Sequence, residues 1–150
     1  MIKDQVFFLP KLLGYLGLLP FIASTLLLFL DSGHSAIWSH FLITYAAIIL
    51  SFIGALYWAF AMTINQLSEI DRKLAFIWSV ISSIIAWISL FMNESFALIL
   101  LVIFFILNLA KDKRLPRNAD LPEWYLPLRL NLTYIVTTCL AFAAIHSNIL

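Results

Sequence analysis

Charged residues are scarce in this 150-residue sequence, where Asp, Glu, Lys and Arg make up 11%. Soluble domains carry about 25%. Hydrophobic residues make up 63% of the chain, and a soluble domain of this size leaves too much of its surface wet to bury such a share. We therefore expect lipid to surround the protein. The net charge of +1 gives no indication of nucleic-acid binding.

Cysteine and catalytic motifs are also scarce. The single cysteine, Cys139, excludes an internal disulfide and a cysteine-based metal cage, and we expect it to pack as a small apolar residue. The chain has no glycine-rich phosphate loop, HExxH or GxSxG. Every Asp and Glu lies at the boundary of an apolar run, so no charge is expected deep in the membrane. We therefore expect no enzyme activity, no cofactor and no metal site.

Long apolar runs dominate what is present. A helix needs about 20 apolar residues to cross the hydrocarbon core, and five runs meet or approach this length. The first continues to Leu30 without a cleavage pattern, so we expect it to be retained. The sequence predicts an all-α membrane protein in which 1–150 form one domain, with spans at 12–30, 38–62, 74–92, 95–110 and 127–145.

Lys and Arg are distributed on one side of these five spans. Cytoplasmic loops collect cations, and the loops at 31–37 and 93–94 contain none. We therefore expect a cytoplasmic N-terminus, a periplasmic C-terminus and a location in the bacterial inner membrane. The nine cations are Lys3, Lys11, Arg72, Lys73, Lys111, Lys113, Arg114, Arg117 and Arg129.

Small side chains recur in the second and third spans. Lipid gives no hydrophobic drive between helices, so small residues mark close helix contacts. We expect these two spans to form a tight antiparallel pair, with the fifth span beside it. The expected contact ridge comprises Ala47, Ser51, Ala55, Ala59, Ser79, Ser83 and Ala86.

The fourth and first spans differ from this pattern. FALILLVIFFIL at 96–107 is large and apolar all round, so we expect the fourth span to be a peripheral helix that faces lipid. In the first span, Pro20 cannot donate a backbone hydrogen bond and predicts a kink near Gly17. The kink is either a moving hinge or a static bend that a neighbour satisfies, and we favour the static bend.

All three histidines are expected on the periplasmic side, together with Asp31 and Glu94. Imidazole and carboxylate groups can bind zinc or copper. The spacing of His34 and His40 matches no ligand motif, and His146 follows far along the chain. We interpret the three as polar loop residues, and the sequence leaves open whether they converge.

The stretch PEWYLPLRLNLTY at 122–134 has two interpretations. In the first it anchors the fifth span, because aromatic rings collect at the membrane boundary, proline suits a first helical turn and an arginine can extend its charge to the lipid phosphates. In the second it binds a ligand or partner. The candidate residues are Trp124, Tyr125, Arg129, Asn131 and Thr133.

Arg129 has an unfavourable position in this stretch. It lies in the first turn of the fifth span, where the positive end of the helix dipole opposes a cation. A negative partner is therefore expected, either a lipid phosphate or one of the nearby carboxylates, Glu123, Glu69 and Asp71. The basic loop after the fourth span favours anionic lipid.

Three segments resemble a known family. They are GLLPF at 17–21, YAAIILSFIGALYW at 45–58 and WYLPLRLNLT at 124–133. Together they are similar to a family of small, five-helix bacterial inner-membrane proteins of unknown function, to which a mitochondrial inner-membrane protein is related. The resemblance implies the fold and the location, and it implies no activity.

Three functions are compatible with these patterns. The first is a non-enzymatic accessory or assembly subunit of a membrane complex, suggested by the apolar fourth span. The second is binding or transport of a lipid or small anion at the cytoplasmic leaflet, suggested by Arg129. The third, a membrane enzyme, would need a polar pocket formed by Tyr57, Trp58, Asn131, Thr133 and Tyr134, and no general base accompanies them.

Overall fold

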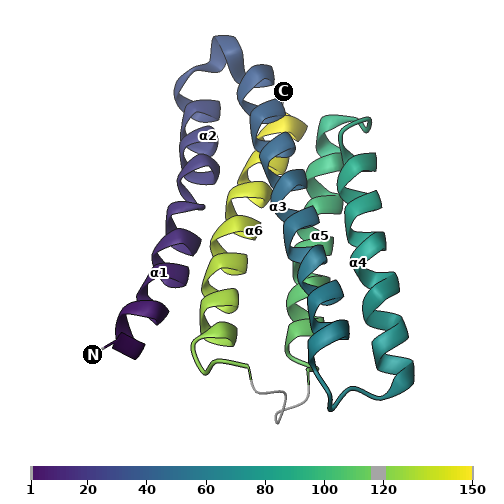
Figure 1. The fold of residues 1–150 in the computed structure, drawn as a ribbon. Coiled ribbons are helices and arrows are strands. Elements are labelled where there is room, and N and C mark those ends of the chain that lie inside the picture. Colours follow the sequence, from purple (N-terminus) through teal and green to yellow (C-terminus); the bar gives the residue numbers. More distant parts are fainter. Residues whose placement is uncertain (1, 116–120, 150) are drawn as a thin grey trace.

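Antiparallel helices form the described part of the chain (Figure 1). The computed structural model describes residues 2–115 and 121–149, with side chains for 8–115 and 121–147. Arg117 lies outside the described residues, as does the side chain of Lys3. Within these ranges there is no strand, and the helices are α1 (Ile2–Leu16), α2 (Leu19–Leu30), α3 (Ser35–Thr63), α4 (Glu69–Ser89), α5 (Glu94–Asp112) and α6 (Tyr125–Ile149), with a 3-10 turn η1 (Ser32–His34).

Among the described residues, five helical segments are long and apolar enough to cross a membrane, as the sequence predicts. The first combines α1 and α2, and the others are α3 to α6. The chain runs up and down through the bundle, so its two ends lie at opposite ends of the molecule (Figure 1). Short loops are held by side-chain caps: Ser68 Oγ accepts from the Asp71 amide at 3.1 Å, and Asn93 Oδ1 accepts from the Ser95 amide at 3.1 Å.

Helices α3 and α4 form the tight antiparallel pair that their small residues predict. Ser51 donates to Ser83 across the contact at 3.1 Å. A Cβ added at Gly54 would lie 2.5 Å from the Ser82 Cβ, so the two backbones approach closely there. The predicted ridge is wrong at Ala55 and Ala59, which are exposed.

The reason for this error is helical geometry. A row of residues at steps of four turns by about 40° per step, because four residues exceed one helical turn. Ala47 is buried and Ser51 is half-buried, but the contact then continues through Gly54. On α4, Ser79 and Ala86 are buried and Ser83 is half-buried, as a contact row requires.

Helix α5 packs against three other helices, so the prediction of a peripheral fourth span is wrong. It packs against α6, α3 and α4, and Leu98, Leu101 and Phe105 are fully or almost fully buried. Its opposite face, with Phe96 and Ile103, is exposed, as the prediction of a lipid-facing helix requires. An all-apolar surface suits lipid and a protein core equally well, and therefore the sequence could not distinguish the two environments. Helix α4 lies at one edge of the bundle, and α1 and α2 lie at the opposite edge (Figure 1). Helix α6 packs mainly against α5 and α2.

The helix of the first span is interrupted between α1 and α2, at Gly17 and Leu18. Pro20 lies in the first turn of α2. The Tyr45 hydroxyl of α3 donates to the Gly17 carbonyl at 3.0 Å. A neighbouring helix thus supplies a donor at the break, which is what a static bend requires.

The up-and-down topology collects the described cations at one end of the bundle. This cationic end contains the start of α1, the end of α3, the start of α4, the end of α5 and the start of α6 (Figure 1). Its described cations are Lys11, Arg72, Lys73, Lys111, Lys113, Arg114 and Arg129. Asp31, His34 and Glu94 lie at the opposite end.

Candidate functional site

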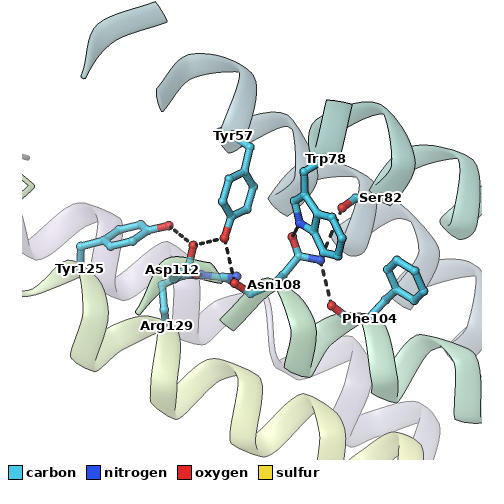
Figure 2. Close-up of polar contacts among 8 residues, drawn as sticks. All are labelled: Tyr57, Trp78, Ser82, Phe104, Asn108, Asp112, Tyr125 and Arg129. Carbon is cyan, nitrogen blue, oxygen red and sulfur yellow. Dashed lines mark hydrogen bonds and ion pairs between the residues drawn. The ribbon is translucent and has the colours of Figure 1, made fainter. Parts of the chain in front are cut away.

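A buried ion pair joins two helix ends at the cationic end. Arg129 Nε of α6 donates to Asp112 Oδ2 of α5 at 2.8 Å, and the two side chains are 8% and 1% exposed (Figure 2). Asp112 is the last residue of α5, where the helix dipole opposes a carboxylate. Arg129 lies in the second turn of α6 and not in the first turn as predicted, because the helix begins at Tyr125, so the dipole opposes its charge less strongly. Paired, the two charges compensate each other.

This pair corrects two expectations about Arg129. Its partner is Asp112 and not Glu123, Glu69 or Asp71. Its guanidinium is buried within the bundle and does not extend to lipid phosphates. Asp112 does lie at the boundary of a span, as predicted, but it points inward.

Two tyrosines complete the environment of Asp112. The Tyr57 hydroxyl lies 2.7 Å from Asp112 Oδ1 and 2.8 Å from the Asn108 carbonyl oxygen, so its single proton is shared between two acceptors. The Tyr125 hydroxyl donates to Asp112 Oδ1 at a longer 3.3 Å (Figure 2). A buried carboxylate requires such donors. Side chains from α3, α5 and α6 therefore meet at Asp112.

The polar contacts continue toward α4 through Asn108. Trp78 Nε1 donates to Asn108 Oδ1 at 3.1 Å, and Asn108 Nδ2 donates to the Phe104 carbonyl at 2.8 Å and weakly to Ser82 Oγ at 3.5 Å (Figure 2). The Lys111 ammonium lies 4.4 Å from the centre of the Trp78 ring. The fully buried Asn108 amide is thus satisfied within the protein.

A cleft of about 580 Å³ lies beside the ion pair, between α1, α2, α3 and α6. Its walls are mainly aliphatic and aromatic, and Arg129 and Thr133 are among its few polar side chains. Arg129 Nη2 and Thr133 Oγ1 are buried and have no hydrogen-bond partner in the described part of the chain. The residues that line the cleft include Leu13, Gly14, Phe21, Tyr45, Ile49, Phe105, Trp124, Leu132 and Val136.

A second cavity, of about 860 Å³, opens between α1 and the start of α6. We call it the mouth cavity. Lys11, Tyr15 and Asn131 give it a polar lining, and Asn131 Nδ2 donates to the Tyr15 hydroxyl at 3.2 Å. Trp124 and Leu128 line both cavities. The two spaces therefore share a wall at the start of α6.

The five candidate residues of the 122–134 stretch have different environments. Arg129 and Thr133 are buried and face the cleft, Trp124 and Tyr125 are half-buried beside it, and Asn131 is exposed in the mouth cavity. The polar pocket of the enzyme hypothesis does not form. Trp58 packs on the Phe76 ring, Tyr134 is 74% exposed and Tyr57 binds Asp112.

The three histidines have separate neighbours. His34 Nδ1 lies 3.0 Å from Asp31 Oδ1, and His146 packs edge-to-face on Phe29 with ring centres 4.9 Å apart. His40 is exposed. Among the described residues, no three His, Cys, Asp or Glu side chains gather as metal ligands do.

Sequence reasoning missed Asp112, Asn108 and Trp78 as members of a polar cluster. One signal was available. Asn108 and Asp112 are four residues apart, so they share one face of an otherwise apolar helix. A polar face in such a span has to meet polar partners on neighbouring helices.

Comparison with known proteins places the chain in a family. It is 26% identical over 142 residues to "Transmembrane protein 69" of Xenopus tropicalis, an alignment that covers 91% of this chain and 54% of the relative. The chain thus spans about half the length of the curated relative that it matches. No solved structure matches the chain. Residues 7–145 match the family model described as "Protein of unknown function (DUF3429)", and the chain is therefore a multi-pass membrane protein that belongs to this family.

Proposed function

We propose that this protein is a non-enzymatic membrane protein that binds one amphiphilic lipid in its cleft, at the leaflet of the cationic end. The observation that carries this proposal is the cleft itself: its walls are apolar, and two unpartnered donors, Arg129 Nη2 and Thr133 Oγ1, lie within them. A bound lipid would place its chain along the apolar walls and its polar end toward the mouth cavity.

The proposal includes an orientation. The described cations gather at one end of the bundle, and cytoplasmic loops are the ones that collect Lys and Arg. We propose that the cationic end faces the cytoplasm of a bacterial cell and that the C-terminus is periplasmic. The cleft would then take its lipid from the cytoplasmic leaflet. Labelling of single cysteines, introduced at Lys73 and at Gly33 in separate variants lacking Cys139, by a membrane-impermeant reagent tests this orientation.

Cleft filling tests lipid binding. Ile49 lines the cleft and is half-buried, whereas its neighbour Ile48 is 59% exposed and does not line the cleft. Ile49→Trp should displace the lipid and Ile48→Trp should not. The protein is extracted with its lipid in a mild detergent, and the bound lipid per chain is measured by native mass spectrometry. Equal lipid occupancy in the two variants would rule the proposal out.

An accessory or assembly subunit is the second proposal, with weaker support. The apolar fourth span suggested it, but one face of α5 is covered by α6, α3 and α4. A partner would instead contact α4, whose outer face carries Ile77 and Trp87, each more than half exposed. Blue-native electrophoresis in mild detergent tests this, and migration of all the protein at monomer mass would count against a stable partner.

A further inference from the structure

The two unpartnered donors of the cleft share one face of α6. Arg129 and Thr133 are four residues apart, and therefore their side chains are neighbours on the helix surface. Both residues are buried, at 6% and 3% exposure, and both line the cleft. Native proteins seldom leave buried donors such as Nη2 and Oγ1 without an acceptor. The missing acceptor is therefore expected from a ligand in the cleft.

The charge balance around Arg129 limits what this acceptor can be. Asp112 already neutralises the guanidinium through the contact of Oδ2 with Nε at 2.8 Å, and the carboxylate is almost completely buried. A phosphate at Nη2 would bring a second negative group to one guanidinium in surroundings of low polarity. Anions that share a buried site repel each other, and burying an uncompensated charge is costly. An uncharged oxygen would satisfy both donors without this repulsion.

We propose, building on lipid binding by the cleft as the proposed function, that the ligand is held by an uncharged carbonyl oxygen between Arg129 Nη2 and Thr133 Oγ1. The ester carbonyl of an acylated lipid has this chemistry and is attached to an apolar chain. The chain would extend along the cleft toward Phe21 and Val136, which line its wall. A carbonyl on a ring with an apolar tail has the same chemistry, and the experiment separates these two sources.

Matched probes test the carbonyl. Three brominated probes with chains of equal length are titrated into the detergent-solubilised protein: a fatty-acyl ethyl ester, the corresponding alkane and the corresponding alkyl phosphate. Bromine quenches nearby tryptophan fluorescence. The fraction of quenching that disappears in Trp124→Phe reports on the cleft, because Trp124 lines it. An alkyl cyclohexanone without bromine, which does not itself quench efficiently, is added as a competitor to represent the ring source.

Thr133 provides the matched pair of variants. Thr133→Val keeps the shape and removes the donor, whereas Thr133→Ser keeps the donor. We expect the ester to bind most tightly and Thr133→Val to weaken it roughly three- to tenfold, as the loss of one hydrogen bond does. Thr133→Ser should bind the ester like the unmodified protein, and neither variant should change binding of the alkane. Stronger competition by the cyclohexanone than by an unbrominated ester would assign the carbonyl to a ring.

The outcomes separate this inference from the proposed function. If ester and alkane bind equally and Thr133→Val changes neither, the cleft holds a chain without recognising a carbonyl, and only the inference fails. If the alkyl phosphate binds more tightly than the ester, the ligand group is an anion and the inference is overturned. If no probe gives Trp124-dependent quenching, the cleft does not bind amphiphiles and both proposals fall.

Discussion

Neutralising Asp112 should be among the most damaging single changes in this protein. Asp112→Asn keeps the size of the side chain and removes its charge. The Arg129 side chain is only 8% exposed, so its charge would remain buried without compensation. Removing one partner of a buried ion pair costs about 3–5 kcal/mol. We expect a loss of that size in the free energy of unfolding.

The contacts of Asp112 set the order of the smaller effects. Tyr57→Phe removes a hydroxyl that lies 2.7 Å from the carboxylate, and a hydrogen bond to a charged group contributes about 1.5–3 kcal/mol. The effect should fall near the lower figure, because the proton is shared with the Asn108 carbonyl. Tyr125→Phe removes a longer contact of 3.3 Å and should cost less than Tyr57→Phe.

A double-mutant cycle separates the ion pair from general packing. Asp112→Leu and Arg129→Met each leave one buried charge unpaired, whereas the double variant leaves none. The double variant should therefore lose less free energy of unfolding than the two single variants lose together, by a coupling energy of at least about 2 kcal/mol. The free energies are measured by SDS unfolding from mixed micelles, followed by far-UV circular dichroism. Additivity of the two losses to within about 0.5 kcal/mol would refute the reasoning.

Three further changes test other contacts. Gly54→Ala should lower the free energy of unfolding by about 1–3 kcal/mol, because the new methyl group would lie 2.5 Å from the Ser82 Cβ. Gly33→Ala is the matched control and should be close to neutral, because its methyl group would meet its nearest atom at 3.9 Å. Tyr45→Phe keeps the ring packing on Phe21 but removes the donor to the Gly17 carbonyl, so SDS unfolding should show a loss of about 1 kcal/mol, and an unchanged stability would mean that the bend holds without it. Hydrogen bonds from His34 and then Trp38 lower the pKa of the Asp31 carboxyl below its ordinary value of 3.8. The stabilisation that they give is therefore present above that value and lost as the pH falls through the lower pKa of the folded state. The indole NMR signal of Trp38 should shift in that acidic window, and an acidic shift that persists in Asp31→Asn would exclude this cause.

The sequence predicts the number of spans and the α3–α4 pair because both follow from local rules. Length and apolar content define a span, and small residues define a close contact. The position of α5 follows no local rule. Lipid tails and neighbouring helices are equally apolar, so an all-apolar helix such as 96–107 fits the edge and the centre of the bundle alike.

The sequence predicts that Arg129 has a negative partner, but it does not identify that partner. The expected negative partner of Arg129 exists, although Arg129 lies in the second turn of α6 and not in the first, where the dipole argument placed it. Choosing that partner needs the packing of α5 against α6, which brings the end of one helix to the start of the other. Asp112 is one of several carboxylates at span boundaries, and the only local signal that it points inward is Asn108, four residues earlier on the same face of α5.

If the cleft binds a ligand as proposed, stability and ligand choice depend on the same charge balance. The neutral Asp112–Arg129 pair holds α5 to α6, and it leaves Arg129 Nη2 as a donor in a site that carries no net charge. A hydrogen-bond donor whose positive charge is already compensated favours a carbonyl over a phosphate, because the phosphate gains no further attraction from that charge. Asp112→Asn removes the compensation. In the fraction of that variant that remains folded, the preference between the ester and the alkyl phosphate should therefore move toward the phosphate, while the protein as a whole becomes less stable.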